Sequence, residues 1–163
     1  MSRTAPGPFE TPAAAEAAFY EAVERCDLRA LERIWALGEG VVCVHPGIDR
    51  AEGRVAVLDS FARMFAGSAR LGFEIVDVVA SRTERLAVHH ARERIRLEGR
   101  LAAVMAATNV YVLQGEGWRL LMHHASHEGG SPAAGGGDGP DGDGDGDGGG
   151  GPEPGAPSGR TLH

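Results

Sequence analysis

The sequence has 163 residues, 42% of them hydrophobic and 24% charged, which suffices for one domain with a buried core. Residues 1–127 hold 16 acidic residues against 15 arginines, so most of the formal charge of −7 lies in residues 128–163, with seven acids and one arginine. The nearly neutral folded part lacks the basic face that nucleic acid requires, which argues against a nucleic-acid partner.

The cellular location is predicted from what the sequence lacks. No apolar run approaches the ~20 residues of a membrane span, so no membrane partner is expected. Residues 1–10 form a flexible leader without the apolar segment of a secretory signal. We therefore expect a cytoplasmic protein in which Cys26 and Cys43 are buried free thiols, although a disulfide between them is the alternative.

Two helices are predicted at the start of a domain that spans residues 11–128. Thr11 offers a capping hydroxyl and Pro12 suits the first helical position. Asp27 caps the second helix, which Gly38 and Gly40 end. Each helix has one apolar stripe, formed by Ala15, Phe19, Ala22, Val23 and Cys26 in the first and by Leu28, Leu31, Ile34 and Trp35 in the second.

A short strand and a third helix follow. Residues 41–45 are apolar up to His45 and stop at Pro46-Gly47. A turn-rich segment then leads to Gly53, where a helix begins that runs to about Phe65. Its buried side is predicted from helical spacing to hold Val57 or Leu58, Phe61, Met64 and Phe65.

Four strands complete the domain, at residues 73–80, 86–97, 101–113 and 118–127. The breaks between them are only three or four residues long, at 81–84, 98–100 and 115–117. Short breaks between consecutive strands predict antiparallel hairpins. The sequence therefore indicates an α+β fold with an antiparallel meander.

Residues 129–163 consist mainly of Gly, Asp, Pro, Ser and Ala and have almost nothing to bury. Such a segment cannot offset its ordering entropy, so it is predicted to be a disordered, acidic tail. The Asp-Gly repeat at 141–147 lacks the late glutamate and flanking helices of a calcium-binding loop. We interpret it as a solvated spacer.

The last strand supplies the main functional hypothesis. In a regular strand, alternate side chains share a face. One face would then hold Trp118, Leu120, Met122, His124 and Ser126, and the other Arg119, Leu121, His123 and Ala125. The first set predicts a pocket wall with His124 as its histidine and Trp118, Met122 and Ser126 as ligand contacts. For His124, a place in the core without ligand contact is an equally favoured alternative. The second set predicts a contact between two copies of the chain.

Two further residues are candidates for acid–base chemistry. His45 ends its strand where a sheet opens, and an imidazole there can exchange a proton near neutral pH. Glu93 belongs to the more apolar parity set of residues 86–97, so it is expected to face inward with a raised pKa. A salt bridge from Glu93 to an arginine is the favoured alternative. No spacing typical of a zinc site occurs, so no metal is predicted.

The whole arrangement resembles the NTF2-like superfamily, and within it the SnoaL-like group. The residues that carry the resemblance are 41–47, the helix at 53–65 with Arg54 and Val57, 107–111 and 118–126. The resemblance implies a cone in which a curved antiparallel sheet wraps around the N-terminal helices, with a pocket inside and dimerisation through the sheet. It implies no single activity, because isomerases, cyclases, dehydratases and non-catalytic members share the fold.

The resemblance leads to one functional hypothesis and one alternative. The steroid isomerases of the superfamily combine a carboxylate base with a tyrosine and a protonated acid. Tyr20 is present on the first helix here, but the strand of His45 ends without an aspartate. We expect a pocket for a small apolar cyclic molecule and, if it is catalytic, cofactor-free acid–base chemistry by His45, His124 and Glu93. The alternative is a non-catalytic binding or dimerisation module.

The remaining ligand contacts are predicted from position alone. Tyr20 and Phe61 lie on helices whose apolar sides face the sheet. Only one of Thr108 and Asn109 can face inward on a regular strand, and alternation alone does not decide which. We predict Asn109 as the ligand contact.

Overall fold

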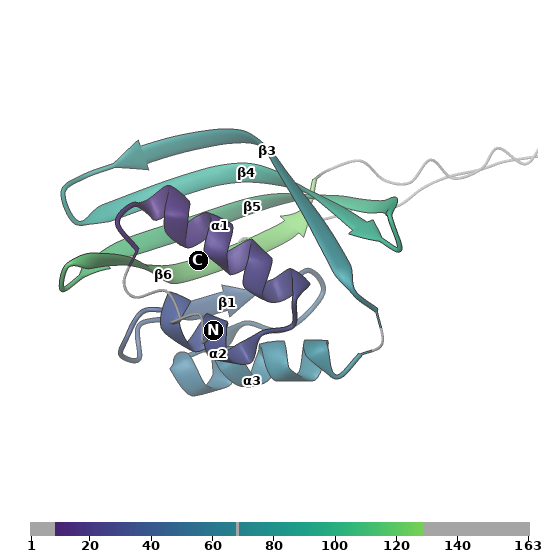
Figure 1. The fold of residues 1–163 in the computed structure, drawn as a ribbon, viewed down its shortest axis with the longest axis horizontal. Helices are drawn as coiled ribbons and strands as arrows, with labels where there is room; N and C mark the ends of the chain where they lie inside the picture. The colour runs from purple at the N-terminus through teal and green to yellow at the C-terminus, as the bar shows by residue number, and fades with distance from the viewer. Residues whose placement is uncertain (1–8, 68, 129–163) are drawn as a thin grey trace, which may run out of the picture. The chain divides into compact units, whose positions relative to one another are not determined.

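The computed structural model describes residues 9–67 and 69–128, which form three helices and one curved sheet of six strands (Figure 1). The helices are α1 (Pro12–Glu24), α2 (Leu28–Ile34) and α3 (Arg54–Phe65). The strands are β1 (Val42–Val44), β2 (Ala51–Glu52), β3 (Leu71–Arg82), β4 (Leu86–Leu97), β5 (Arg100–Gln114) and β6 (Gly117–His127). The predicted tail at 129–163 and most of the leader lie outside the described residues.

The sheet is mixed, with the strand order β2-β1-β6-β5-β4-β3. The predicted meander is confirmed, because β3 to β6 pair antiparallel in chain order. The parallel pairing of β1 with β6, next to the edge strand β2, was not predicted. The short β2 was not predicted either. Both features depend on how the chain returns to the sheet after α2, which local hydrophobic periodicity does not encode.

The helices begin where their capping residues predict. The hydroxyl of Thr11 accepts a hydrogen bond from the backbone N–H of Ala14 at 3.1 Å, and Oδ1 of Asp27 accepts one from Ala30 at 2.9 Å. Helix α2 ends at Ile34, four residues before Gly38. Instead of continuing the helix, Ala36 donates its N–H to the carbonyl of Leu120 at 2.8 Å.

Helix α1 lies across the concave face of the sheet, and the core fills the space between them (Figure 1). Phe19 of α1 contacts the rings of Trp35 and Phe61 edge-on, with centroids about 6 Å apart. Both cysteines are free, Cys43 buried and Cys26 partly exposed. Within the residues that the structure describes, no helix is long and apolar enough to cross a membrane.

Strand β6 carries a β-bulge that decides which of its side chains face the core. On β5, the neighbours Val110 and Tyr111 pair with Met122 and Leu120, so Leu121 is the extra residue. A bulge shifts the alternation of side chains by one residue. Trp118 and Leu120 therefore face inward before the bulge, and His123 and Ala125 face inward after it.

Candidate functional site

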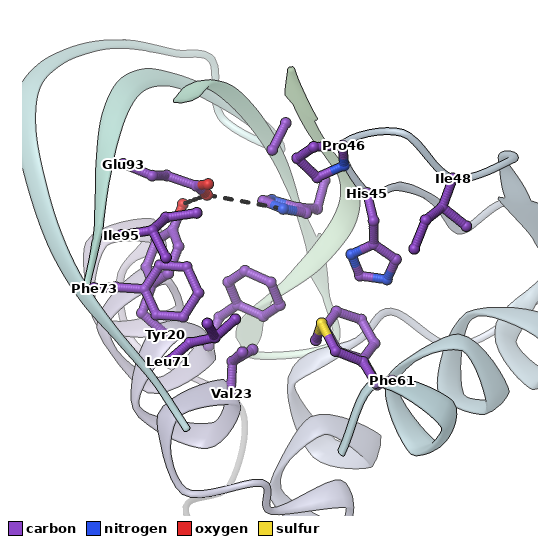
Figure 2. Close-up of a pocket in the computed structure, with 14 residues that line it drawn as sticks. Tyr20, Val23, His45, Pro46, Ile48, Phe61, Leu71, Phe73, Glu93 and Ile95 are labelled. Carbon is purple, nitrogen blue, oxygen red and sulfur yellow. Dashed lines mark hydrogen bonds and ion pairs between the residues drawn. The ribbon is translucent and has the colours of Figure 1, made fainter. Parts of the chain in front are cut away.

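A partly open cavity of about 240 Å³ lies between α1, α3, the end of β1 and the concave face of the sheet (Figure 2). This volume is below the ~300–1,000 Å³ typical of pockets for drug-sized ligands. Its wall is mostly apolar, with four polar side chains. The apolar part includes Phe19, Val23, Phe61, Met64, Phe73 and Ile95, and the polar side chains are Tyr20, His45, Glu93 and His123.

Glu93 is the buried carboxyl of this cavity, with 2% of its surface exposed. Its Oε1 accepts a hydrogen bond from the hydroxyl of Tyr20 at 2.8 Å. Burial raises the pKa of Glu93 to about 7, the hydrogen bond from Tyr20 opposes this rise, and the nearby carboxyl of Glu16 adds to it. Glu93 can therefore gain or lose a proton at neutral pH.

His123 faces Glu93 across a corner of the cavity. Its Nε2 lies 3.8 Å from Oε1 of Glu93, which is the dashed contact between Glu93 and a ring nitrogen in Figure 2. Its Nδ1 lies 2.6 Å from Oδ1 of Asn109. Burial lowers the pKa of His123 to about 3, with smaller contributions from His45 and His124. His123 is therefore neutral at pH 7, and its contact with Glu93 is not an ion pair.

His45 lines the cavity from the end of β1, and Figure 2 shows its ring facing the cavity. Its Nε2 lies 3.1 Å from the hydroxyl oxygen of Ser60, which donates its own hydrogen to the carbonyl of Val57 at 2.7 Å. Burial lowers the pKa of His45. Burial also raises the pKa of the neighbouring Cys43 thiol to about 12, so this thiol stays protonated at neutral pH.

A buried polar network lies behind the cavity wall and links α1 to the sheet. Oε2 of Glu16 accepts hydrogen bonds from Tyr111 at 2.9 Å and from Asn109 at 3.2 Å, and lies 3.0 Å from Nδ1 of His89. The amide nitrogen of Asn109 also donates to the hydroxyl of Tyr20 at 3.0 Å. The network therefore ends at Tyr20, which contacts Glu93, and at His123.

The predicted inward position of His124 is wrong. His124 is exposed, and the buried histidine at this point is His123. Strict alternation holds only in a regular strand, whereas the bulge at Leu121 exchanges the two faces of the residues that follow it. His124 and Ser126 instead border a shallow surface cleft of about 330 Å³, which His45 also touches. The predicted outward position of His123 is wrong for the same reason, whereas Arg119, which precedes the bulge, alternates with the inward-facing Trp118 and Leu120 as predicted.

Two other predicted ligand contacts lie away from the cavity. Trp118 faces inward, but it packs in the core, where the guanidinium carbon of Arg82 lies 4.8 Å from its ring centroid. Met122 follows the bulge and faces outward, with 36% of its surface exposed. Neither side chain lines the cavity.

The remaining candidates lie together at the cavity, and the partners of Glu93 differ from the expected ones. Glu93, His45, Tyr20 and Phe61 all line the cavity. Glu93 contacts Tyr20 and His123, so the favoured alternative of a salt bridge to an arginine is wrong. The arginines of β4 point to the other side of the sheet from Glu93. There Arg92 pairs with Asp77 and Glu128, and Glu74 pairs with both Arg94 and Arg96.

Asn109 rather than Thr108 faces inward, and it contacts the cavity residues from behind. Two members of the site were missed by sequence reasoning, His123 and Glu16. A signal for Glu16 exists in the sequence, since it lies three and four residues before Phe19 and Tyr20, on the buried stripe of α1. Among the described residues, no three His, Cys, Asp or Glu side chains are grouped to hold a metal ion.

A curved sheet around a helix, with a small cavity inside, defines an NTF2-like fold. A family model of the SnoaL-like domain matches residues 13–128, and the chain belongs to this family. No curated protein sequence matches the chain significantly.

Several solved structures are similar to the chain. One is a putative calcium/calmodulin-dependent protein kinase type II association domain from Thiobacillus denitrificans, 33% identical over 76% of this chain and 100% of that one, with a TM-score of 0.67. Another is a putative dehydratase of the NTF2-like family from Streptomyces avermitilis, 35% identical over 72% and 94%, with a TM-score of 0.66. An NTF2-like protein of unknown function from Pseudomonas putida, at 19% identity over 72% and 84% and a TM-score of 0.63, supports the fold alone.

Proposed function

We propose that this protein binds a small, largely apolar cyclic molecule in the cavity beside α1 and moves a proton on it without a cofactor. Glu93 is the proposed proton-transfer group, and the neutral imidazoles of His45 and His123 hold the substrate. The observation that carries this proposal is the convergence of Glu93 and His123, 3.8 Å apart, on one small apolar cavity.

The pKa of Glu93 suits this role. A general acid or base is most effective when its pKa lies near the working pH, and the pKa of Glu93 is raised to about 7. The carboxylate form takes a proton from a carbon of the substrate and becomes a carboxylic acid. Returning that proton to another carbon gives an isomerisation, and giving it to a leaving hydroxyl releases water. Glu93 ends each cycle as a carboxylate, so no further reactant is consumed.

The likeness to the Streptomyces avermitilis protein supports the second of these outcomes, because that protein is named a putative dehydratase and is 35% identical. A dehydratase of this kind needs a substrate with a hydroxyl group one carbon away from an acidic C–H. The apolar wall around Glu93 suits such a substrate if the rest of it is a hydrocarbon ring.

Proton exchange in D₂O tests the proposal directly. Proton NMR with 3-hydroxycyclohexanone should show deuterium entering C2, or cyclohexenone forming, faster with the protein than without it. Glu93→Gln should lower this rate by about 100-fold or more, because it removes the only group proposed to carry the proton. His124→Ala is the matched control, since His124 adjoins His123 but lies outside the cavity. Equal rates in the wild type and Glu93→Gln would refute the proposal.

A second candidate function is a non-catalytic association module. The 33% identity to the putative kinase association domain from Thiobacillus denitrificans favours it. The outer face of the sheet supports association between two copies, because Val88, Val110 and Met122 are paired in one row across β4, β5 and β6. All three are at least partly exposed. We propose a homodimer through this row. If the protein is only an association module, it should form this dimer and show no proton exchange in the NMR test.

A further inference from the structure

The hydrogen-bond network behind the cavity determines which way the amide of Asn109 points. Asn109 is fully buried, so each of its polar atoms needs a partner inside the protein. One end of the amide lies 3.2 Å from Oε2 of Glu16 and 3.0 Å from the hydroxyl of Tyr20. Oε2 of Glu16 already receives a hydrogen from Tyr111, and the hydroxyl hydrogen of Tyr20 goes to Glu93. Both atoms are acceptors here, so the amide nitrogen faces them.

The orientation of Asn109 determines the tautomer of His123. With its nitrogen toward Glu16 and Tyr20, Asn109 turns its oxygen to Nδ1 of His123 at 2.6 Å. An amide oxygen only accepts hydrogen bonds, so Nδ1 carries the hydrogen. A neutral imidazole has one N–H, which leaves Nε2 with a free lone pair. The lowered pKa of His123 is consistent with this neutral form.

When Glu93 is ionised, the polar corner of the cavity consequently offers acceptors and lacks a free donor. Nε2 of His123 lies on the side of Glu93, whose carboxylate oxygens also accept. The hydroxyl hydrogen of Tyr20 is taken up by Glu93. A ligand atom that reaches this corner therefore meets two acceptors, and an ether or ketone oxygen there would leave Nε2 of His123 without a partner.

We propose that the cavity selects neutral molecules with a hydroxyl group, as in alcohols, phenols or enols, over ethers and ketones of the same size. Asn109, held by Glu16, acts as a positioning residue that keeps Nε2 of His123 unprotonated. This proposal rests on the cavity of the proposed function and adds to it the class of substrate. The selectivity is a difference in binding affinity, so it can be measured whether or not the bound molecule reacts.

Matched probes test the selectivity. Phenol and anisole, and cyclohexanol and cyclohexanone, are titrated into the protein at pH 8, where Glu93 is mainly ionised, and binding is followed by NMR. Phenol should bind about 10-fold more tightly than anisole, and cyclohexanol more tightly than cyclohexanone, since leaving a buried acceptor unpaired weakens binding. Equal affinity within each pair, or no binding of either hydroxylated probe at millimolar concentration, would overturn the proposal.

The tautomer is measured separately on the ligand-free wild type, by ¹⁵N NMR with labelled histidine. A directly bonded proton is expected at Nδ1 of His123 and none at Nε2, and the reverse result would overturn the proposal. Asn109→Leu should abolish both the tautomer preference and the preference for phenol, whereas the control His124→Ala should change neither. If Asn109→Leu does not fold, the wild-type measurements still decide.

The two proposals fail in different ways. Preference for phenol without proton exchange in 3-hydroxycyclohexanone would refute the enzymatic function and leave the selectivity intact. Proton exchange without preference for phenol would refute the selectivity alone.

Discussion

Replacing Glu93 by glutamine should stabilise the protein increasingly as the pH rises. Glutamine resembles the protonated acid in shape and still accepts the hydrogen bond from Tyr20, but it never ionises. In the wild type the pKa of Glu93 rises from 4.5 in the unfolded chain to about 7 in the folded one. Between these values the folded state holds its proton while the unfolded state releases it, so wild-type stability falls with rising pH. Below 4.5 this loss is absent, and above 7 it is complete.

The magnitude follows from the size of the pKa shift. At about 1.4 kcal/mol for each pKa unit, the stability gained in Glu93→Gln is about 1 kcal/mol at pH 5 and about 3 kcal/mol at pH 8. The other titratable groups around Glu93 are present in both proteins, so their effects largely cancel in the difference. They are Tyr20 and Glu16 on α1, His123 on β6, and Cys43 and His45 at β1.

Urea denaturation followed by circular dichroism, at pH 5, 6, 7 and 8, measures this difference. The Glu74→Gln variant is a suitable control, because Glu74 is a half-exposed carboxyl on the neighbouring strand β3. This variant removes a carboxyl outside the cavity, so it shows how large a pH-dependent difference such a removal causes by itself. A difference for Glu93→Gln that stays constant with pH, or a variant less stable than the wild type at pH 8, would refute the assignment of a raised pKa to Glu93.

Three further predictions concern the acid side, the outer sheet face and the tail. Because the pKa of His123 falls from 6.5 to about 3 on folding, the unfolded state takes up a proton first, so in urea melts the stability of the wild type relative to His123→Gln should fall as the pH drops below about 6.5. Met122→Glu should convert the proposed dimer to single chains in sedimentation experiments at micromolar concentration, and a wild type that sediments as one chain throughout would contradict the dimer. Truncation after Glu128 should leave the melting temperature unchanged, and a loss of several degrees would contradict the prediction from composition that the tail does not pack.

Most of the fold was predictable because its signals are local. The capping residues Thr11 and Asp27 gave the starts of α1 and α2, and the short breaks between strands gave the antiparallel meander. Alternation along β4 correctly placed Glu93 inside. Each of these features depends on residues close together in the chain, where propensity and periodicity are informative.

The errors at the site arise where pairing between distant residues overrides local alternation. The bulge at Leu121 depends on how β6 pairs with β5, and one extra residue was enough to exchange His124 for His123. Similarly, the partners of Glu93 come from α1 and β6, far from it in sequence, so the adjacent arginines were a misleading guide. Glu16 was overlooked because a glutamate on a helix usually faces solvent.

Glu93, as the proposed proton-transfer group, should contact the molecule that binds in the cavity. The most direct test is a ¹³C NMR titration of the Glu93 carboxyl carbon, assigned with Glu93→Gln, without and with saturating phenol. We expect a midpoint near pH 7 in the free protein and a clear change in that midpoint when phenol binds. A midpoint near the ordinary glutamate value of about 4.5, unchanged by phenol, would contradict it.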